Sequence, residues 1–282
     1  MLTSIIENQD GTFLIGGYAQ SEAKGNSKNP LAKNAKGYQN LVKLSSLGYM
    51  EGLYSKWPRI DKELILQYHE GLIATTCCLG ASVPQSILRD GEEAAEKEFK
   101  WWLDLFGEDY FIEIQRHNIK EQELINNTLL QFSKKFNVPV IQDSAQSTGA
   151  YYKGKRVGSV ADLTCFSFYP TKNLSCWGDA GAVTGSGKYL ETIRQLRNHG
   201  QSSRFKMNMV GWNARMDSIQ AEVLINKLPE LDKHNARRRA IATQYNGNLH
   251  GIVEIPVQNV NSTHVYHQYI ICLLYTSDAA DE

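Results

Sequence analysis

Two residues near the middle of the chain could carry covalent amine chemistry. Asp143 ends the largely apolar stretch 138–143, and Lys172 follows it in a turn rich in hydroxyl groups, residues 167–174. A lysine amine forms a Schiff base with a carbonyl, and a carboxylate that keeps a pyridine nitrogen protonated makes the ring an electron sink. This pair is therefore what pyridoxal 5'-phosphate (PLP) chemistry requires. Taken alone, Lys172 would be an ordinary solvated lysine, since the chain has 30 basic residues.

The elements that must position these residues alternate between helical and strand patterns. Helices with apolar faces are predicted at 31–46, 92–106, 121–136 and 218–231, with a basic helix centred on 237–239. Short apolar or alternating stretches predict strands at 71–75, 110–114 and 137–141. Strands that alternate with helices indicate an α/β fold with parallel pairing.

Composition excludes several classes of protein. The 30 basic and 30 acidic residues cancel, so no overall field favours nucleic acid or an anionic membrane. No apolar stretch reaches the length of a membrane span, and no signal peptide opens the chain. The five cysteines show no CxxC spacing, which argues against a disulfide framework or a zinc knuckle. We expect a reduced, cytoplasmic enzyme.

The stretch 30–141 resembles the PHP (polymerase and histidinol phosphatase) domain of the bacterial DNA polymerase III alpha subunit. The matching segments are 36–41, 58–61, 70–73, 105–110 and 113–117. The family's opening His-rich metal motif and its closing Asp-x-His pair are absent, and only Cys78 occupies a ligand position. A single thiolate cannot hold a catalytic metal cluster, so we expect no metal site.

The stretch 138–271 resembles the DegT/StrS family of PLP-dependent sugar aminotransferases. The matching segments are 143–146, 149–155, 167–174, 178–183, 197–200 and 211–217. The resemblance implies that Lys172 forms the Schiff base, that Asp143 pairs with the pyridine nitrogen and that Gln146 lies near the ring hydroxyl. It also implies that Ser167 binds the cofactor phosphate. Asn213 would reach the phosphate of the neighbouring subunit's cofactor, as in the homodimers of this family.

The expected fold class is α/β, a partial PHP-type fragment followed by a partial type I aminotransferase-like large domain. The residues 272–282 resemble a translated sequencing adapter and interrupt an apolar strand expected at 269–271, so they are set aside as a tail. The leader carries a predicted strand at 12–18 and a weak resemblance to a β-repeat. The predicted parts are 1–29 (unassigned leader), 30–141 (partial PHP domain), 142–271 (partial aminotransferase domain) and 272–282 (tail).

Three interpretations of function follow. By the ancestry of the C-terminal half, the chemistry is transfer of an amino group from a glutamate-like amino acid to a keto group of a nucleotide-linked sugar. The alternatives are a DNA polymerase III alpha fragment, the only interpretation that involves nucleic acid, and a chimeric reading frame with no activity. The ring that stacks on PLP and half of the phosphate site come from the first half of full-length family members. We therefore expect weak or absent PLP binding and an inactive truncated chain, with no membrane partner.

Overall fold

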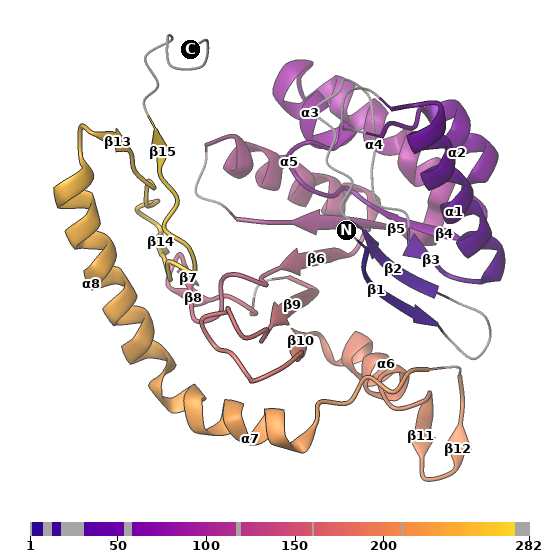
Figure 1. Cartoon of the computed structure of the whole chain (residues 1–282). Helices are drawn as coiled ribbons and strands as arrows, with labels where there is room; N and C mark the ends of the chain where they lie inside the picture. The colour runs from indigo at the N-terminus through magenta and orange to yellow at the C-terminus, as the bar shows by residue number, and fades with distance from the viewer. Residues whose placement is uncertain are drawn as a thin grey trace. The chain divides into compact units, whose positions relative to one another are not determined.

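The chain divides into two compact units, each described here by itself (Figure 1). Unit 1 comprises residues 1–142 and 186–215, and unit 2 comprises residues 143–185 and 216–282. The computed structural model describes residues 2–7, 13–17, 31–53, 58–116, 120–159, 161–209 and 211–273. Within these ranges, no helix combines the length and the apolar character needed to cross a membrane.

Unit 1 alternates strands with helices through most of its length. Its strands are β1 (Leu2–Glu7), β2 (Phe13–Gly17), β3 (Leu31–Ala32), β4 (Leu72–Thr75), β5 (Tyr110–Ile114), β6 (Val140–Asp143, whose last residue opens unit 2), β11 (Gln201–Ser203) and β12 (Lys206–Met207). Its helices are α1 (Ala35–Met50), α2 (Lys62–Tyr68), α3 (Ser82–Arg89), α4 (Glu92–Phe106), the 3-10 turn η1 (Gly107–Asp109), α5 (Lys120–Phe136) and α6 (Gly187–Leu196).

Three consecutive strands of unit 1 are parallel. Ala74 of β4 pairs with Tyr110 of β5, and Ile112 of β5 pairs with Val140 of β6. The connections run through α3 and α4 and then through α5, because parallel strands need a crossover connection. The short β3 adds an antiparallel edge against β4. The predicted parallel α/β arrangement is therefore confirmed.

An aromatic core lies between these strands and the helices α4 and α5. Phe99 of α4 is fully buried, and its ring centroid lies 5.2 Å from those of both Tyr110 and Phe132. Trp102 stacks on Phe106 at 5.7 Å. Burial together with the charge of Glu98 raises the pKa of Tyr110. Rings at these separations interact favourably beyond the area they bury.

Two glycines allow the start of α1 to lie directly on the turn before β4. A Cβ built on Gly37 would lie 1.8 Å from the carbonyl oxygen of Gly71, and Gly71 itself has a φ of +74°. The side chain of Asn34 caps α1 by accepting a hydrogen bond of 2.8 Å from the amide of Gly37. Only glycine fits both positions, because any side chain would meet backbone atoms.

Unit 2 combines short strands with two helices that follow one another (Figure 1). Its strands are β7 (Tyr151–Tyr152), β8 (Lys155–Arg156), β9 (Leu163–Ser167), β10 (Gly181–Gly185), β13 (Val253–Glu254), β14 (Ser262–Thr263) and β15 (Cys272–Leu273). Its helices are α7 (Ser218–Lys227), the 3-10 turn η2 (Leu228–Glu230) and α8 (Leu231–Leu249). The strands β9 and β10 are antiparallel, with Ser167 opposite Gly181.

Several predicted elements agree closely with the structure, and two were wrong in whole or in part: residues 31–32 of the helix expected at 31–46 form the strand β3 instead. The helix expected at 92–106 and the strand expected at 110–114 have those bounds in α4 and β5. The strand expected at 269–271 does not form. The strand β15 forms instead at Cys272–Leu273, inside the predicted tail, and pairs with β13. Residues 274–282 of that tail, and most of the predicted leader, lie outside the described residues. The predicted domain boundaries stay a prediction.

Candidate active site

Asp143 is the last residue of β6 and the first of unit 2. Its Oδ1 accepts a hydrogen bond of 2.9 Å from the amide of Ala145. The next amide, that of Ser144, donates to the carbonyl of Cys165 at 2.9 Å, which joins the end of β6 to β9. The residue that follows Asp143 is therefore bonded to the middle of β9, the strand that ends at Ser167.

Lys172 lies in the loop between β9 and β10 and is partly buried. Its amide donates to the carbonyl of Tyr169 at 2.8 Å, which closes a tight turn. Pro170 occupies the second position of this turn, where its fixed φ is favourable. The hydroxyl of Ser167 accepts a hydrogen bond of 3.4 Å from the amide of Tyr169. A short bonded turn thus links the predicted phosphate-binding hydroxyl to the predicted Schiff-base lysine.

Apolar packing holds this lysine loop against α7 and α8. The residues after the lysine bury Leu174 and Cys176 in a cluster with Leu224 of α7 and Leu231 of α8. The backbone amide of Trp177 donates to the side chain of Gln220 at 2.8 Å. Because both apolar contacts and a polar bond join the loop to the helices, its conformation is tied to the fold of unit 2.

Hydrogen bonds between side-chain amides also attach the lysine loop to other segments of unit 2. Asn173, next to Lys172 in sequence, donates from Nδ2 to Asn235 Oδ1 at 2.7 Å and to the carbonyl of Val265 at 2.8 Å. Asn235, which is 1% exposed on α8, donates to the carbonyl of Thr148 at 3.2 Å. We call these residues, Thr148, Asn173, Asn235 and Val265, the amide node. It joins four segments of unit 2 at the position next to the lysine.

Gly149 makes room for the amide node. Its φ is +85°, and a Cβ built on it would lie 2.5 Å from Nδ2 of Asn235. The turn after β6 therefore approaches α8 as closely as the missing side chain allows. This explains physically why a glycine stands here, six positions after Asp143.

His267 lies close to two cations, Lys172 and Arg238. Arg238 donates from Nη1 to the carbonyl of Tyr266 at 3.2 Å, one residue before His267. Burial lowers the pKa of His267, and the positive charges of Lys172 and Arg238 lower it further. Burial also lowers the pKa of His264, whose Nδ1 accepts a hydrogen bond of 2.9 Å from the amide of Tyr266. His267 thus lies near Lys172, and the lowered pKa values favour the neutral form of both imidazoles.

The remaining predicted site residues lie elsewhere. Gln146 is exposed in the turn after β6. Asn213 is exposed in unit 1, where it forms an isolated β-bridge with Asn198, a residue whose side chain accepts a hydrogen bond from Arg215. The structure thus places Asp143, Gln146, Ser167 and Lys172 in unit 2 and Asn213 in unit 1. The cofactor roles of all five residues remain predictions.

Unit 1 contains the other candidate position, Cys78, and a surface hollow. Across the described ranges, no three His, Cys, Asp or Glu side chains gather in a way that could hold a metal ion, and the expectation of no metal stays a prediction.

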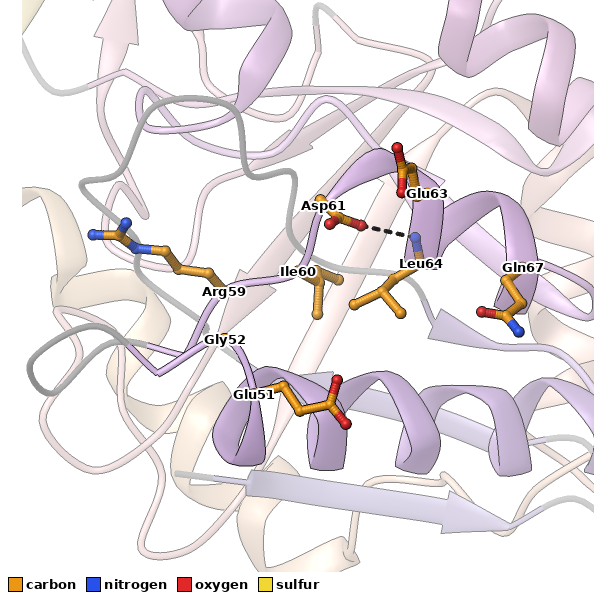
Figure 2. A pocket seen from close by; sticks show the side chains of 8 residues that line it. All are labelled: Glu51, Gly52, Arg59, Ile60, Asp61, Glu63, Leu64 and Gln67. Atoms are coloured by element: carbon orange, nitrogen blue, oxygen red, sulfur yellow. Dashed lines mark hydrogen bonds between the residues drawn. The ribbon is translucent and has the colours of Figure 1, made fainter.

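Figure 2 shows the hollow, of about 550 Å³, between the end of α1 and the start of α2. Asp61 caps α2 there by accepting from the amide of Leu64 at 2.8 Å. None of the residues predicted for cofactor chemistry lines it.

Two protein families account for the chain. Residues 127–282 match the DegT/DnrJ/EryC1/StrS aminotransferase family, and residues 10–117 match the PHP domain. The first match covers more than half of the 282 residues. The chain belongs to the DegT/DnrJ/EryC1/StrS aminotransferase family. Its N-terminal part is PHP-like, so the two-part composition predicted from the sequence is confirmed.

The individual relatives also fall into two groups, transaminases and DNA polymerase III alpha subunits. A dTDP-3-amino-3,4,6-trideoxy-alpha-D-glucose transaminase of Streptomyces venezuelae is 37% identical over 148 residues, which are 51% of this chain and 39% of that protein. A DNA polymerase III subunit alpha of Borreliella burgdorferi is 46% identical over 110 residues, which are 39% of this chain and 10% of that protein. The chain thus spans well under half the length of either relative.

Solved structures of the aminotransferase family share the fold. The S. venezuelae DesV structure, in complex with a ketimine intermediate, gives a TM-score of 0.53 at 33% identity and covers 58% of this chain and 44% of its own. A DegT DnrJ EryC1 StrS aminotransferase from Brucella abortus gives 0.55 at 27% identity and covers 68% of this chain and 49% of its own. The predicted type I aminotransferase-like fold is therefore confirmed.

The family matches begin and end at different residues from those predicted. The PHP match starts at residue 10, inside the predicted leader, and ends at 117 rather than 141. The aminotransferase match starts at 127 and runs to 282, so it includes the tail. The adapter origin of 272–282 stays a prediction, and nothing in the described residues tests it.

The donor set of unit 2 fits PLP. Asp143 uses Oδ1 in a local hydrogen bond, and Ser167 accepts from a local amide, so its hydroxyl proton can point to a phosphate oxygen. Ser144 Oγ is buried and, among the described residues, has no hydrogen-bond partner. A carboxylate, two hydroxyls and a lysine, at strand ends and in the loop after β9, are the chemical groups that a phosphorylated pyridine cofactor needs.

Sequence reasoning missed the amide node and the neutral imidazoles. Asn235 lies in a strongly polar helix, where an asparagine is usually solvated, so neither its type nor its spacing signalled burial. The only available signal was Asn173 beside Lys172, since a polar residue next to a site residue often supports it. His267 carried no signal in the sequence alone.

Proposed function

We propose that unit 2 carries the chemistry of a PLP-dependent sugar aminotransferase. The observation that supports it is the hydrogen bond from the amide of Ser144 to the carbonyl of Cys165. It holds the predicted carboxylate, Asp143, beside the strand that ends in Ser167 and leads into the turn of Lys172. The relatives' names supply the substrate class: an amino group would pass from a glutamate-like amino acid to a keto group of a nucleotide-linked sugar.

Each side chain would have one task. Bound PLP supplies an electron sink for the carbon that exchanges its amino group. Asp143 would hold the proton on the pyridine nitrogen, and Ser167 would donate a hydrogen bond to the phosphate. Lys172 would bind the cofactor covalently and then move the proton between donor and acceptor. Gln146 near the ring hydroxyl and Asn213 at a neighbouring subunit's phosphate complete the proposal, in a cytoplasmic homodimer.

We also propose that this chain holds PLP weakly. Residues 10–117 match the PHP domain, so we expect neither an aminotransferase's stacking ring nor its second phosphate-binding loop from them. Each charge-assisted hydrogen bond that is lost costs about 1.5–3 kcal/mol. Losing two or three such contacts weakens affinity by roughly a thousandfold or more.

A PLP titration followed by absorbance tests the role of the lysine. We expect the wild-type chain to develop the absorbance band of a Schiff base only at cofactor concentrations well above micromolar. The Lys172→Ala variant should lose the band, whereas Lys155→Ala, at an exposed position of β8, should keep it. An identical band in wild type and Lys172→Ala would contradict the assignment of Lys172.

The second candidate function is that of a DNA polymerase III alpha fragment. The specific observation that favours it is the parallel pairing of β4 with β5 in unit 1, in a segment that matches the PHP domain. A manganese-dependent exonuclease assay on single-stranded DNA tests it, and activity would support this function over the first. No signal in either assay would favour the third interpretation, a chimeric reading frame without activity.

A further inference from the structure

Two consecutive cysteines of unit 1 form a pair of thiols at the carboxyl end of β4. Cys77 is buried, Cys78 is partly exposed, and neither takes part in a disulfide. The two residues are consecutive and their side chains interact with each other, so the two sulfurs are neighbours. The resemblance to the PHP domain assigns a ligand position to Cys78 alone, and the proposed aminotransferase chemistry does not involve Cys77.

The backbone fixes the geometry of this pair. Cys77 has a φ of 56°, in the left-handed region that non-glycine residues rarely adopt. Its amide donates to Thr75 Oγ1 at 3.2 Å, and the carbonyl of Cys78 accepts from the amide of Ala81 at 3.0 Å. Hydrogen bonds on both sides therefore hold the two residues in a conformation that a free dipeptide would seldom visit.

A fixed carboxylate stands next to the thiols. Glu113 of β5 accepts from Thr75 Oγ1 at 2.9 Å and from Gln115 Nε2 at 2.9 Å, one bond to each carboxylate oxygen. The hydrogen bond with Cys78 raises the pKa of Cys77, and burial and the charge of Glu113 raise it further. Since the thiolate is the nucleophile in alkylation, a reagent that attacks one sulfur should react slowly at Cys77.

We propose that Cys77 and Cys78 form a binding site for trivalent arsenic, which would take both sulfurs at once. With an organic arsenoxide, two As–S bonds form while two S–H bonds and the As=O bond break. The arsenic-bound oxygen leaves with both thiol protons as one water, and no atom changes oxidation state. Once the first sulfur is bound, the second is held at a high effective concentration, which can raise affinity by about 10²–10⁴.

Titration of the reduced full-length chain with phenylarsine oxide tests this site. We expect one arsenical per chain by intact mass, with the loss of one water, and protection of two of the five thiols from later alkylation in denaturant. The adduct should survive excess 2-mercaptoethanol and be removed by dithiothreitol, since only a dithiol competes with two As–S bonds. An adduct removed by 2-mercaptoethanol, or none at all, would overturn the proposal.

Matched variants identify the sulfurs. Cys78→Ser should weaken binding by roughly 100-fold or more, because a single As–S bond remains. Cys77→Gly should weaken binding to a similar extent. Because glycine adopts the positive φ of this position without strain, the fold is kept. Cys272→Ser, at an exposed thiol of unit 2, should bind as the wild type does. Unchanged binding in Cys77→Gly would place the arsenical elsewhere and refute the site.

Discussion

Units 1 and 2 stabilise their interiors by different means. Unit 1 is centred on rings, with Phe99 in contact with Tyr110 and Phe132. Unit 2 has a small apolar cluster, and its buried centre includes the amides of Asn173 and Asn235. Apolar burial is non-directional and tolerates adjustment, whereas hydrogen bonds between buried amides fix distance and angle. Unit 1 also buries hydrogen-bonded amides, at Gln122 and Asn126, but its centre is aromatic, whereas amide hydrogen bonds attach the lysine loop within unit 2.

The largest expected effect is at the ring core of unit 1. Phe99→Ala should lower the free energy of unfolding of unit 1 by about 3–5 kcal/mol, since it leaves a cavity among packed rings. Chemical denaturation with hydrogen exchange as a readout for each unit checks this. Val42→Ala, on the exposed side of α1, is the control and should change stability little. Equal losses in the two variants would show that unit 1 has no specific aromatic core.

The next effect concerns the amide node. Asn235→Ala removes the partner of Asn173 and leaves the carbonyl of Thr148 buried without its donor, which should cost unit 2 about 1–3 kcal/mol. Hydrogen exchange should accelerate at residues 171–177, the lysine loop, more than in α4. Asn226→Ala, at an exposed position of α7, serves as the matched control. Unchanged hydrogen exchange at residues 171–177 would show that the amide node does not stabilise the lysine loop.

Two glycine variants test how closely Gly149 approaches Asn235 in the amide node. Gly149→Ala and Gly154→Ala both place a side chain at positive φ, which costs about 1–2 kcal/mol. Only the first introduces a Cβ 2.5 Å from Asn235 Nδ2, whereas nothing lies within 4 Å of the second. Gly149→Ala should therefore destabilise unit 2 by the larger amount in denaturant titration. A double variant with Asn235→Ala should remove most of that difference, and a difference that persists would contradict the close approach.

The smallest effect is a dependence of unit 2 on pH. Burial lowers the pKa of His264 and His267 below the ordinary value of 6.5. Above pH 6.5 both histidines are neutral, folded or unfolded, and their contribution to stability is complete. As the pH falls below 6.5 the unfolded chain binds protons first, so the stability of unit 2 decreases until the folded pKa values are passed.

The variant His264→Gln isolates this dependence. Protonation of His264 at Nδ1 would also end the hydrogen bond that it accepts from the amide of Tyr266. Denaturant titrations at pH 7.5 and 5.5 should show a smaller pH effect in His264→Gln than in wild type. His250→Gln, at an exposed position, should behave as the wild type. A larger pH effect after loss of His264 would reverse the assigned sign.

The features that could be predicted from the sequence are those that depend on local pattern. The helix α4 has its predicted bounds because an apolar face ends at Gly107, and β5 has its predicted bounds because burial alternates along Tyr110–Ile114. Asp143 and Lys172 were found from their residue types in strand-end and turn patterns. Asn235 and the strand β15 could not be predicted, because their roles depend on partners distant in sequence, Asn173 and β13.

The most direct test of the central claim is to map where PLP attaches. The wild-type chain is incubated with PLP, reduced with borohydride and digested, and the modified lysine is identified by mass spectrometry. We expect selective modification of Lys172 at high cofactor concentration, and loss of that selectivity in Asp143→Asn, where the partner of the pyridine nitrogen is removed. Modification spread over the surface lysines, as in the denatured chain, would contradict the account. Efficient labelling of Lys172 at micromolar PLP, with turnover of glutamate, would instead show that the site is complete.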